Sequence, residues 1–157
     1  MKPKIIDNNG ELGPVLGYVA DDTVTVRPVY KTRGAVAFDI AISEHATIPR
    51  WRFKAVHTGL RFEIPEGYEV QIRSRSGLAA NKGAFILNSP GTVDWDYKGE
   101  LLLVVANLGL APLRLERGDR VAQGVFCPAL RAPLKEISLA DMTNSERGEG
   151  RFGSTGD

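Results

Sequence analysis

Alternating hydrophobic and polar residues form several short segments along this chain. Strict alternation occurs over residues 23–26, 61–64, 68–73 and 113–115. Successive side chains of a strand point to opposite faces, so this pattern is typical of half-buried β-strands. Turn residues, mainly Gly, Pro, Ser and Asp, separate the segments. Many short strands joined by such turns predict a sandwich, a jelly roll or a barrel.

Two further segments depart from alternation. Residues 101–106 are continuously apolar. Their short length and the flanking Gly99 and Gly109 favour a strand buried on both faces over a short core helix. Residues 76–82 can hold one short helix. The chain is therefore predicted to be all-β with at most one short helix.

Length and charge restrict the class of protein. The 157 residues fit one compact domain, and 20 basic against 19 acidic side chains leave a net charge of +1. This balance excludes a nucleic-acid binder that relies on bulk positive charge, although it is compatible with a local basic pocket for a phosphorylated ligand. We therefore expect no nucleic-acid partner.

The single cysteine and the lack of long apolar runs bear on the compartment. Cys127 cannot form an internal disulfide, and its apolar surroundings predict a buried core thiol rather than a nucleophile. No apolar run approaches the roughly 20 residues that cross a bilayer. Residues 1–13 lack the apolar centre of a signal peptide. We expect a cytoplasmic protein with no membrane partner.

Composition changes near the C-terminal end. Apolar content falls after Ile137, and the last twelve residues read ERGEGRFGSTGD. Such a segment cannot bury enough surface to order itself, so a disordered terminus is one interpretation. The other is an arm that orders over a ligand, because Arg147, Arg151 and Phe152 supply two cations and an aromatic ring for a phosphorylated base.

Residues 73–83, RSRSGLAANKG, contain a candidate phosphate site. Arg75 and Ser76 precede Gly77, where a ligand can approach the backbone closely. A guanidinium, a hydroxyl and backbone N–H groups in one turn can hold a phosphate. Ser-Gly turns beside an arginine are also common surface features, so this segment alone does not establish a site.

Residues 88–100, NSPGTVDWDYKGE, combine a Pro-Gly turn with acidic and aromatic side chains. Asp94 and Asp96 bracket Trp95, and Tyr97 follows. In a strand the two aspartates would share one face. Two acids and a tyrosine near a tight turn could orient a water molecule and pack against a base, but a hairpin with solvated acids fits the spacing equally well.

Two more segments place polar residues beside apolar strands. In residues 117–123, RGDRVAQ, Arg120 and Gln123 follow a Gly-Asp turn, which by itself predicts a hairpin with a surface ion pair. Asp39 lies inside the apolar run 35–41, where a carboxylate must be paired or hydrogen-bonded. Pairing with an arginine and a place near a bound metal are both open.

The chain offers no recognisable protein-held metal or nucleotide loop. His45 and His57 lie far apart, and no cysteine–histidine cluster has zinc-ligand spacing. No Walker-type glycine loop is present.

Taken in chain order, these segments resemble the five motifs of the trimeric dUTPase (deoxyuridine triphosphate nucleotidohydrolase) family. AFDIA resembles the first, RSGLA the second, NSPGTVDWDYKGE the third, GDRVAQ the fourth and RGEGRFGSTG the fifth. The likeness extends from about Val24 to Gly156. It implies a distorted jelly-roll or β-barrel subunit with three parts: an N-terminal extension of uncertain role (1–22), a β core (23–137) and a flexible C-terminal arm that closes over the active site (138–157).

The resemblance also implies an activity and its residues. The expected reaction is hydrolysis of dUTP to dUMP and pyrophosphate, which limits uracil incorporation into DNA and supplies dUMP for thymidylate synthesis. Asp94 matches the carboxylate that activates the attacking water, Tyr97 the residue that packs on deoxyribose and excludes a 2′-hydroxyl, and Asn88 the side chain that reads uracil. The other implied substrate-binding positions are Gly91, Thr92 and Val93 for the base, Arg75, Ser76, Gly77 and Gln123 for the phosphates, and Arg147, Phe152, Gly153, Ser154 and Thr155 in the arm.

A cofactor and an assembly follow from the same resemblance. Mg²⁺ would be held by the triphosphate and by water molecules rather than by a protein cage, in keeping with its preference for phosphate oxygens. Asp39 matches a structural position or one that reaches the metal through water. The family is homotrimeric, with active sites at subunit junctions and each arm supplied by another subunit.

The sequence departs from the family pattern in two motifs. The first motif usually reads Ala-Gly-Tyr-Asp-Leu, and here Ala37 and Phe38 replace the glycine and the tyrosine. This puts the local packing in question, together with any hydrogen bond from the missing hydroxyl. In the fifth motif Arg151 stands where a second glycine is usual.

Three other functions compete with this interpretation. dCTP deaminases share the fold but carry a catalytic glutamate in the strand after the third motif, where Val104 stands here. A non-catalytic, ligand-gated interaction module and a structural jelly-roll protein are the other two. Asp94, Tyr97 and the arm motif argue against both, because neither function requires them.

Overall fold

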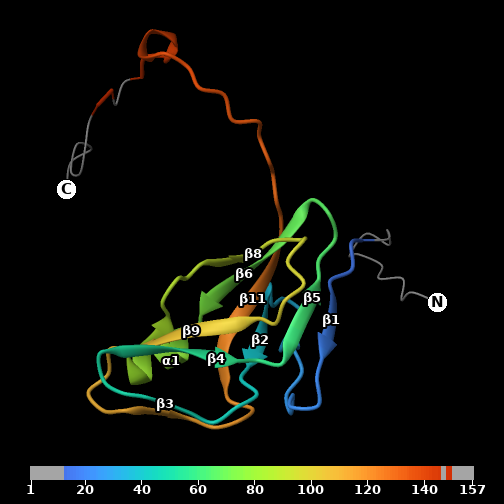
Figure 1. Cartoon of the computed structure of the whole chain (residues 1–157), viewed down its shortest axis with the longest axis vertical. Coiled ribbons are helices and arrows are strands. Elements are labelled where there is room, and N and C mark those ends of the chain that lie inside the picture. The colour runs from blue at the N-terminus through green and yellow to red at the C-terminus, as the bar shows by residue number, and fades with distance from the viewer. Residues whose placement is uncertain (1–12, 146–147, 150–157) are drawn as a thin grey trace.

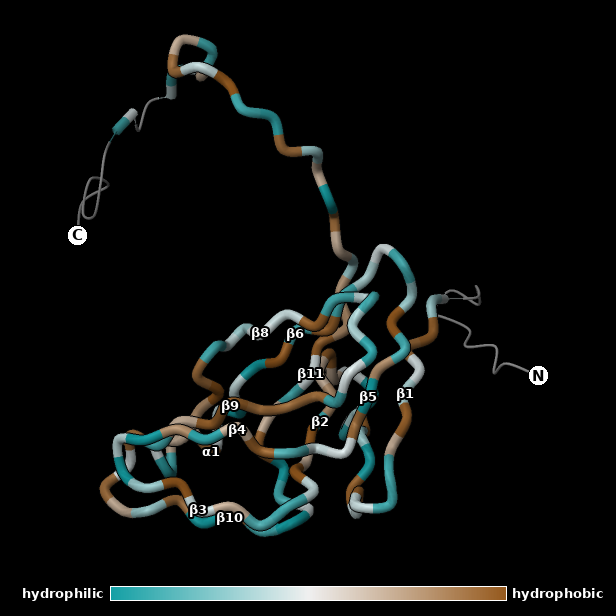
Figure 2. Tube along the Cα trace, viewed as in Figure 1, coloured by the Kyte–Doolittle hydropathy of each residue, from teal (hydrophilic) through white to brown (hydrophobic). Residues whose placement is uncertain are grey.

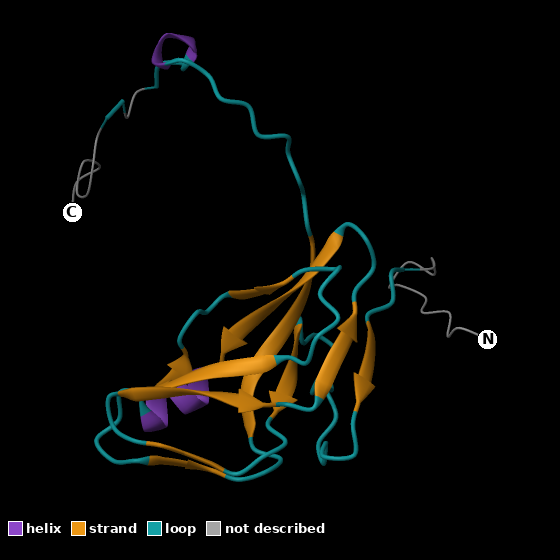
Figure 3. Ribbon diagram, viewed as in Figure 1, coloured by secondary structure: helices purple, strands orange, loops and turns teal. Residues whose placement is uncertain are grey.

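The computed structural model describes residues 13–145 and 148–149, and within them the chain is almost entirely β (Figures 1 and 3). All the paired strands are antiparallel. The elements are β1 (Gly17–Ala20), β2 (Ala37–Ala41), β3 (Ala46–Ile48), β4 (Arg52–His57), β5 (Leu60–Glu63), β6 (Tyr68–Ser74), α1 (Ser76–Lys82), β7 (Ala84–Ile86), β8 (Gly91–Val93), β9 (Leu102–Asn107), β10 (Leu113–Leu115), β11 (Arg120–Pro128) and the 3-10 turn η1 (Leu139–Asp141).

Four small sheets build a jelly-roll-like body, which confirms the all-β prediction. The largest has the strand order β2-β11-β6-β8, and a second has the order β4-β9-β7. The pairs β1-β5 and β10-β3 complete the arrangement. In the largest sheet β11 lies between β2 and β6, so Gln123 of β11 stands opposite both Asp39 and Arg73. This register brings three distant segments of the sequence together.

The core follows the alternation of the sequence. Val70 and Ile72 of β6 are buried between the sheets, and Leu103 and Val105 of β9 pack in the same core. Figure 2 shows the hydrophobic colouring along β9 where it crosses the body. The strand prediction for residues 101–106 is confirmed, but burial on both faces is wrong, because Leu102 is 45% exposed.

The strand predicted at residues 23–26 is also wrong. This segment forms turns and bends. The Asp21 carboxylate accepts a hydrogen bond from the Thr23 N–H at 2.8 Å. Arg117 Nε donates to the Thr23 carbonyl at 2.7 Å. Side chains thus satisfy backbone groups that a neighbouring strand would otherwise have to pair.

Part of the region before residue 23 belongs to the folded body. β1 pairs with β5 from Gly17 opposite Glu63 to Ala20 opposite Leu60. The Asp21 N–H then donates to the Gly59 carbonyl at 3.1 Å. Residues 17–20 therefore form a two-stranded sheet with β5, whereas residues 1–12 lie outside the described part of the chain.

The only α-helix of the described residues is the one expected at 76–82. It ends at Gly83, which adopts the left-handed conformation (φ 63°) that closes many helices. No helix in the described part of the chain is long and apolar enough to cross a membrane.

The chain leaves the strands after β11 and runs away from the body (Figure 1). Residues 130–145 are exposed, and Leu130 and Leu139 are 99% and 83% exposed. Hydrophobic and hydrophilic residues follow one another along this stretch (Figure 2). The expected arm residues Arg147, Phe152, Gly153, Ser154 and Thr155 lie outside the described residues.

Candidate active site

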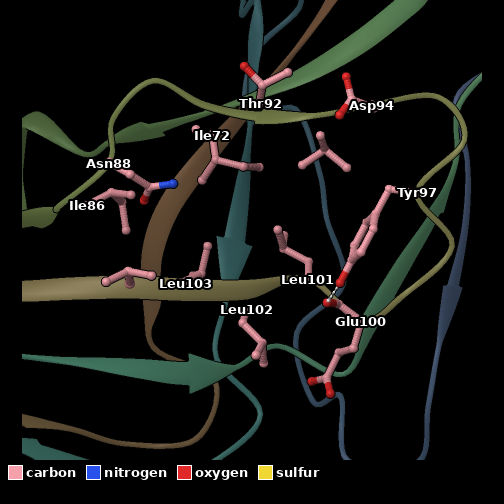
Figure 4. A pocket seen from close by; sticks show the side chains of 13 residues that line it. Ile72, Ile86, Asn88, Thr92, Asp94, Tyr97, Glu100, Leu101, Leu102 and Leu103 are labelled. Atoms are coloured by element: carbon pink, nitrogen blue, oxygen red, sulfur yellow. Dashed lines mark hydrogen bonds between the residues drawn. The ribbon is translucent and has the colours of Figure 1, made fainter.

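A cavity of about 250 Å³ lies between β9 and the segment formed by β8 and the loop that follows it (Figure 4). Its apolar walls come from β6, β7 and β9 and include Ile72, Ile86 and Leu103. These wall residues follow the pattern of ordinary core strands, so no sequence signal distinguishes them. The six residues predicted from the third motif all line the cavity: Asn88, Gly91, Thr92, Val93, Asp94 and Tyr97.

Strand alternation determines which of these side chains face the body. β8 pairs with β6, so Gly91 stands opposite Ile72 and Val93 opposite Val70. Gly91 and Val93 are buried, whereas Thr92 and the following Asp94 are exposed. Figure 4 shows the side chains of Thr92 and Asp94 on the outer side of this strand.

Asp94 does not share a strand face with Asp96, as the sequence led us to consider. β8 ends at Val93, and the chain then turns, with the Tyr97 N–H donating to the Asp94 carbonyl at 3.1 Å. Asp94 borders a second cavity, lined also by Glu69, Asp96 and Arg131. An exposed carboxylate between two cavities is accessible to water and to a ligand in either one.

Tyr97 forms the far end of the first cavity. Its hydroxyl donates a hydrogen bond to the Glu100 backbone carbonyl at 2.9 Å (Figure 4). Gly99 makes this arrangement possible, because a Cβ there would lie 2.6 Å from Cζ of the tyrosine ring. The ring is 47% exposed and can therefore contact a ligand.

A second group of predicted residues lies on the large sheet around Asp39. Its Oδ1 lies 3.1 Å from Arg75 Nε, and its Oδ2 lies 3.0 Å from Arg120 NH1. The Asp39 side chain is 14% exposed, so pairing with arginine, one of the two alternatives considered, holds in this structure. Two guanidinium groups on one carboxylate leave a local excess of positive charge, which suits a phosphate.

The remaining phosphate candidates border this cluster. Gln123 donates from Nε2 to the Ser74 carbonyl at 3.1 Å. Ser76 and Gly77 are exposed at the start of α1. None of these residues lines the cavity between β8 and β9. Arg120 belongs with them, although the sequence offered only its place in the fourth motif as a signal.

Glu100 lies beneath the cavity in a network that the sequence did not reveal. Its carboxylate accepts hydrogen bonds from the Gly59 N–H at 2.9 Å and the Thr58 N–H at 3.2 Å. His57 Nδ1 lies 3.1 Å from its Oε2. This hydrogen bond and the negative charge of Glu100 raise the pKa of His57. Burial raises the pKa of Glu100, but the Gly59 N–H and His57 outweigh burial and lower it.

Phe38 explains how the altered first motif is accommodated. The side chain is 3% exposed and packs edge-on against Tyr30 and Phe62, with ring centroids 5.7 and 5.9 Å apart. A ring buried among aromatic side chains needs no hydroxyl partner. The substitution thus leaves Asp39, the next residue, in place on β2.

The described residues do not form a protein-held metal site. Across them, no group of three or more His, Cys, Asp or Glu side chains is placed to hold a metal ion.

Val104, where a deaminase would carry its glutamate, also lines the cavity. Glu100 lines it as well, but its carboxylate is occupied by the hydrogen bonds from residues 57–59.

Solved structures of bacteriophage dUTPases have a similar fold. A Staphylococcus bacteriophage 80alpha dUTPase mutant solved with dUpNHpp superposes with a TM-score of 0.82 and 24% identity, covering 91% of this chain and 99% of that one. A mutant dUTPase from phage phi11 of S. aureus, described with a structural Mg(II) ion, has a TM-score of 0.73 and 20% identity over 82% of this chain and 99% of its own. At such identities the likeness concerns the fold.

Sequence comparison gives the closer relationship. The dUTPase family profile matches residues 25–156. The deoxyuridine 5'-triphosphate nucleotidohydrolase of Wolinella succinogenes is 47% identical over 131 residues, covering 83% of this chain and 87% of the relative. The enzyme of the same name from Rhizobium etli is 48% identical over 133 residues, covering 82% and 84%. The chain therefore belongs to the dUTPase family.

Proposed function

We propose that this protein is a dUTP diphosphatase, which hydrolyses dUTP to dUMP and pyrophosphate. The observation that carries the proposal is the cavity between β8 and β9, where Asn88, Asp94 and Tyr97 meet around apolar walls. The reaction would limit uracil incorporation into DNA and supply dUMP for thymidylate synthesis. The cytoplasm remains the compartment expected from the sequence.

The cavity suits the base and the sugar of the substrate. Its volume of about 250 Å³ is below the roughly 300–1,000 Å³ typical of ligand sites, so the triphosphate must lie outside it. The Asn88 amide offers both a donor and an acceptor, as a uracil edge requires, and backbone groups of Gly91, Thr92 and Val93 complete the base contacts. Tyr97 packs on the deoxyribose and leaves no space for a 2′-hydroxyl.

The triphosphate would meet the cationic cluster of the large sheet. Arg75 and Gln123 supply N–H donors, Ser76 a hydroxyl and Gly77 an unobstructed backbone, since nothing lies within 4 Å of the position a Cβ would take there. The arm would add Arg147 at the γ-phosphate, Ser154 and Thr155 as further phosphate donors, and Phe152 with Gly153 over the uracil.

Asp94 would activate the attacking water. As the water oxygen bonds to the α-phosphorus, Asp94 takes the water proton and the bond from that phosphorus to the bridging oxygen breaks. Pyrophosphate leaves with the electron pair of the broken bond. Arg75 and the arm residues stabilise the charge that develops on the phosphate oxygens.

The donor set fits a Mg²⁺ ion that arrives with the substrate. Both oxygens of Asp39 face arginines, so Asp39 would reach the ion only through water. Triphosphate oxygens and water molecules are ligands that Mg²⁺ prefers. When bound, the ion would neutralise phosphate charge and fix the conformation of the triphosphate.

Three observations support an assembly with sites shared between subunits, which by resemblance to the family would be a homotrimer. The nucleoside cavity and the phosphate cluster do not share their lining residues within one subunit. Apolar side chains of the β4-β9-β7 sheet are exposed, with Phe53 at 64% and Leu102 at 45%. Residues 130–145 carry exposed leucines away from the body. A second copy that covered these surfaces would remove apolar area from water.

The deaminase alternative is less well supported. Deamination needs a carboxyl group that moves protons at the base, and Val104 cannot do so. Glu100 lines the cavity, but its carboxylate accepts hydrogen bonds from the Thr58 and Gly59 N–H groups. Asp94, directly after β8, is the carboxylate left for chemistry at a phosphate.

Isotope labelling tests both the reaction and the bond that breaks. In ¹⁸O-labelled water with Mg²⁺ and dUTP, we expect one ¹⁸O atom in dUMP and none in pyrophosphate. Mass spectrometry of both products measures this. Label in pyrophosphate would mean attack at the β-phosphorus and would contradict the role given to Asp94.

A further inference from the structure

We propose that Glu100 is a positioning residue that fixes Tyr97 in the cavity wall and thereby sets the discrimination between deoxyribose and ribose. The inference rests on the proposed function, because it requires Tyr97 to contact the sugar. Glu100 itself need not touch the substrate. It would act by holding the group that accepts the tyrosine hydroxyl.

The Glu100 side chain is anchored on the turn between β4 and β5. Its carboxylate accepts the N–H groups of Thr58 and Gly59 and faces His57 Nδ1. This turn is itself held to the chain before it, because the Asp21 N–H donates to the Gly59 carbonyl at 3.1 Å. The Glu100 side chain therefore attaches the end of the loop between β8 and β9, which carries Tyr97, to the turn between β4 and β5.

The peptide group that holds Tyr97 is fixed from its other side as well. The carbonyl of Glu100 and the N–H of Leu101 share one planar peptide unit. That N–H donates to the Leu60 carbonyl at 2.8 Å, while the Glu100 carbonyl accepts the Tyr97 hydroxyl at 2.9 Å. Thr58 Oγ1 donates to the Leu101 carbonyl at 2.7 Å. A rotation of the Glu100–Leu101 peptide would break the first two of these bonds together, while the bond from Thr58 holds the next peptide.

The rest of the loop is held by contacts that do not involve Tyr97. Lys98 Nζ lies 2.9 Å from Glu63 Oε1 and 3.0 Å from the Trp95 carbonyl. Arg61 NH1 donates to the Lys98 carbonyl at 3.3 Å. Loss of the Glu100 carboxylate would therefore loosen the tyrosine and leave the loop attached to β5. The dUTP:UTP selectivity would therefore change more than the stability of the fold.

The test compares kcat and KM for dUTP and for UTP in Glu100→Ala, Glu100→Gln and the wild-type full-length protein. We expect Glu100→Ala to lower the dUTP:UTP ratio of kcat/KM about ten-fold, the size of effect expected when a pocket rejects a hydroxyl less strictly. Glu100→Gln keeps an oxygen that can accept from Gly59, so it should restore the ratio to within about three-fold.

A matched control separates this effect from general destabilisation. Glu116 also faces a histidine Nδ1, that of His45, but both side chains are exposed and Glu116 does not line the cavity. Glu116→Ala should leave the dUTP:UTP ratio unchanged. If Glu100→Ala hydrolyses dUTP with the wild-type ratio, the positioning role is wrong while the proposed function stands. A wild-type protein that does not hydrolyse dUTP would instead overturn the proposed function.

A double-mutant cycle tests whether Glu100 acts through Tyr97. Tyr97→Phe is combined with Glu100→Ala in one double variant and with Glu100→Gln in another. The dUTP:UTP ratio of kcat/KM is measured for each single and double variant. If the two residues act through one hydrogen bond, Glu100→Ala should add less than about two-fold to the loss already caused by Tyr97→Phe. Additive effects would contradict the proposal. If Glu100→Ala does not fold, Glu100→Asp takes its place, because the shorter side chain draws the carboxylate back from the Thr58 and Gly59 N–H groups.

Discussion

Asp39 and Asp94 have the same side chain in opposite environments. Asp39 is 14% exposed and paired with Arg75 and Arg120, so its charge is already compensated. Asp94 is exposed at the end of β8, between two cavities. A carboxylate held by two guanidinium groups is suited to orienting them, whereas a carboxylate beside a ligand cavity can accept a proton from water.

The proton-accepting role of Asp94 can be tested by an isosteric change. Asp94→Asn should lower kcat by a factor of about 10²–10⁴, the usual contribution of a general base, while dUTP still binds. Steady-state kinetics and calorimetric titration with dUTP measure the two effects. Asp96→Asn is the matched control, since Asp96 lies two residues away and does not line the β8–β9 cavity. Retention of most activity in Asp94→Asn would reject this role.

The sequence identified candidate residues but did not reveal their contacts. Alternation and motif order identified Asp39, Asn88, Asp94 and Tyr97 as candidates. They did not reveal that Arg120 reaches Asp39 across 81 positions, because such pairing depends on strand register. The Glu100 network was missed for the same reason, since its partners lie in a turn about 40 residues earlier that carries no motif.

At the scale of elements, local pattern predicted the strands well where the core decides their structure. β5, β6, β9 and β10 follow the alternation or apolar runs of their sequences, and α1 lies where one short helix was expected. The failure at residues 23–26 has a local cause: Asp21 and Arg117 satisfy the backbone there. Side-chain hydrogen bonds of this kind are invisible to a pattern of hydrophobic positions.

The turn between β4 and β5 offers a stability test. Gly59→Ala should lower the free energy of unfolding by about 2–4 kcal/mol, because both the positive φ and the contact with Asp21 oppose a Cβ. Gly67→Ala is the control, since Gly67 also has positive φ but nothing lies within 4 Å. It should lose only about 1–2 kcal/mol. Urea unfolding at one protein concentration measures both, and equal losses would show that crowding at residue 59 is unimportant.

On the scale of the whole molecule, the candidate nucleoside and phosphate regions are separate within one chain. The nucleoside cavity lies between β8 and β9, the phosphate cluster lies around Asp39, and the chain beyond β11 leads away from the body (Figure 1). Apolar side chains are exposed on β4, β9 and residues 130–145, where we propose that a second copy binds. The proposed assembly could not be predicted from periodicity, because it depends on contacts between chains.

Subunit mixing tests the shared site. Asp94→Asn subunits and subunits truncated after Ser145 should each be nearly inactive but folded. When the two variants are mixed in equal amounts and assemble at random, about a quarter of wild-type activity should return. One site in four would then combine an intact Asp94 with an intact arm from another subunit. Light scattering confirms the assembly. If each arm closed the site of its own subunit, no mixture would recover activity.

The central claim is the reaction itself, and product analysis with four nucleotides tests it most directly. The purified protein is incubated with Mg²⁺ and either dUTP, dTTP, dCTP or UTP, and nucleoside monophosphate, pyrophosphate and ammonia are measured. We predict dUMP and pyrophosphate from dUTP, with far slower hydrolysis of the other three nucleotides and no ammonia from any of them. Ammonia from dCTP would contradict this function in favour of a deaminase, and no product from any nucleotide would leave a binding or regulatory role in its place.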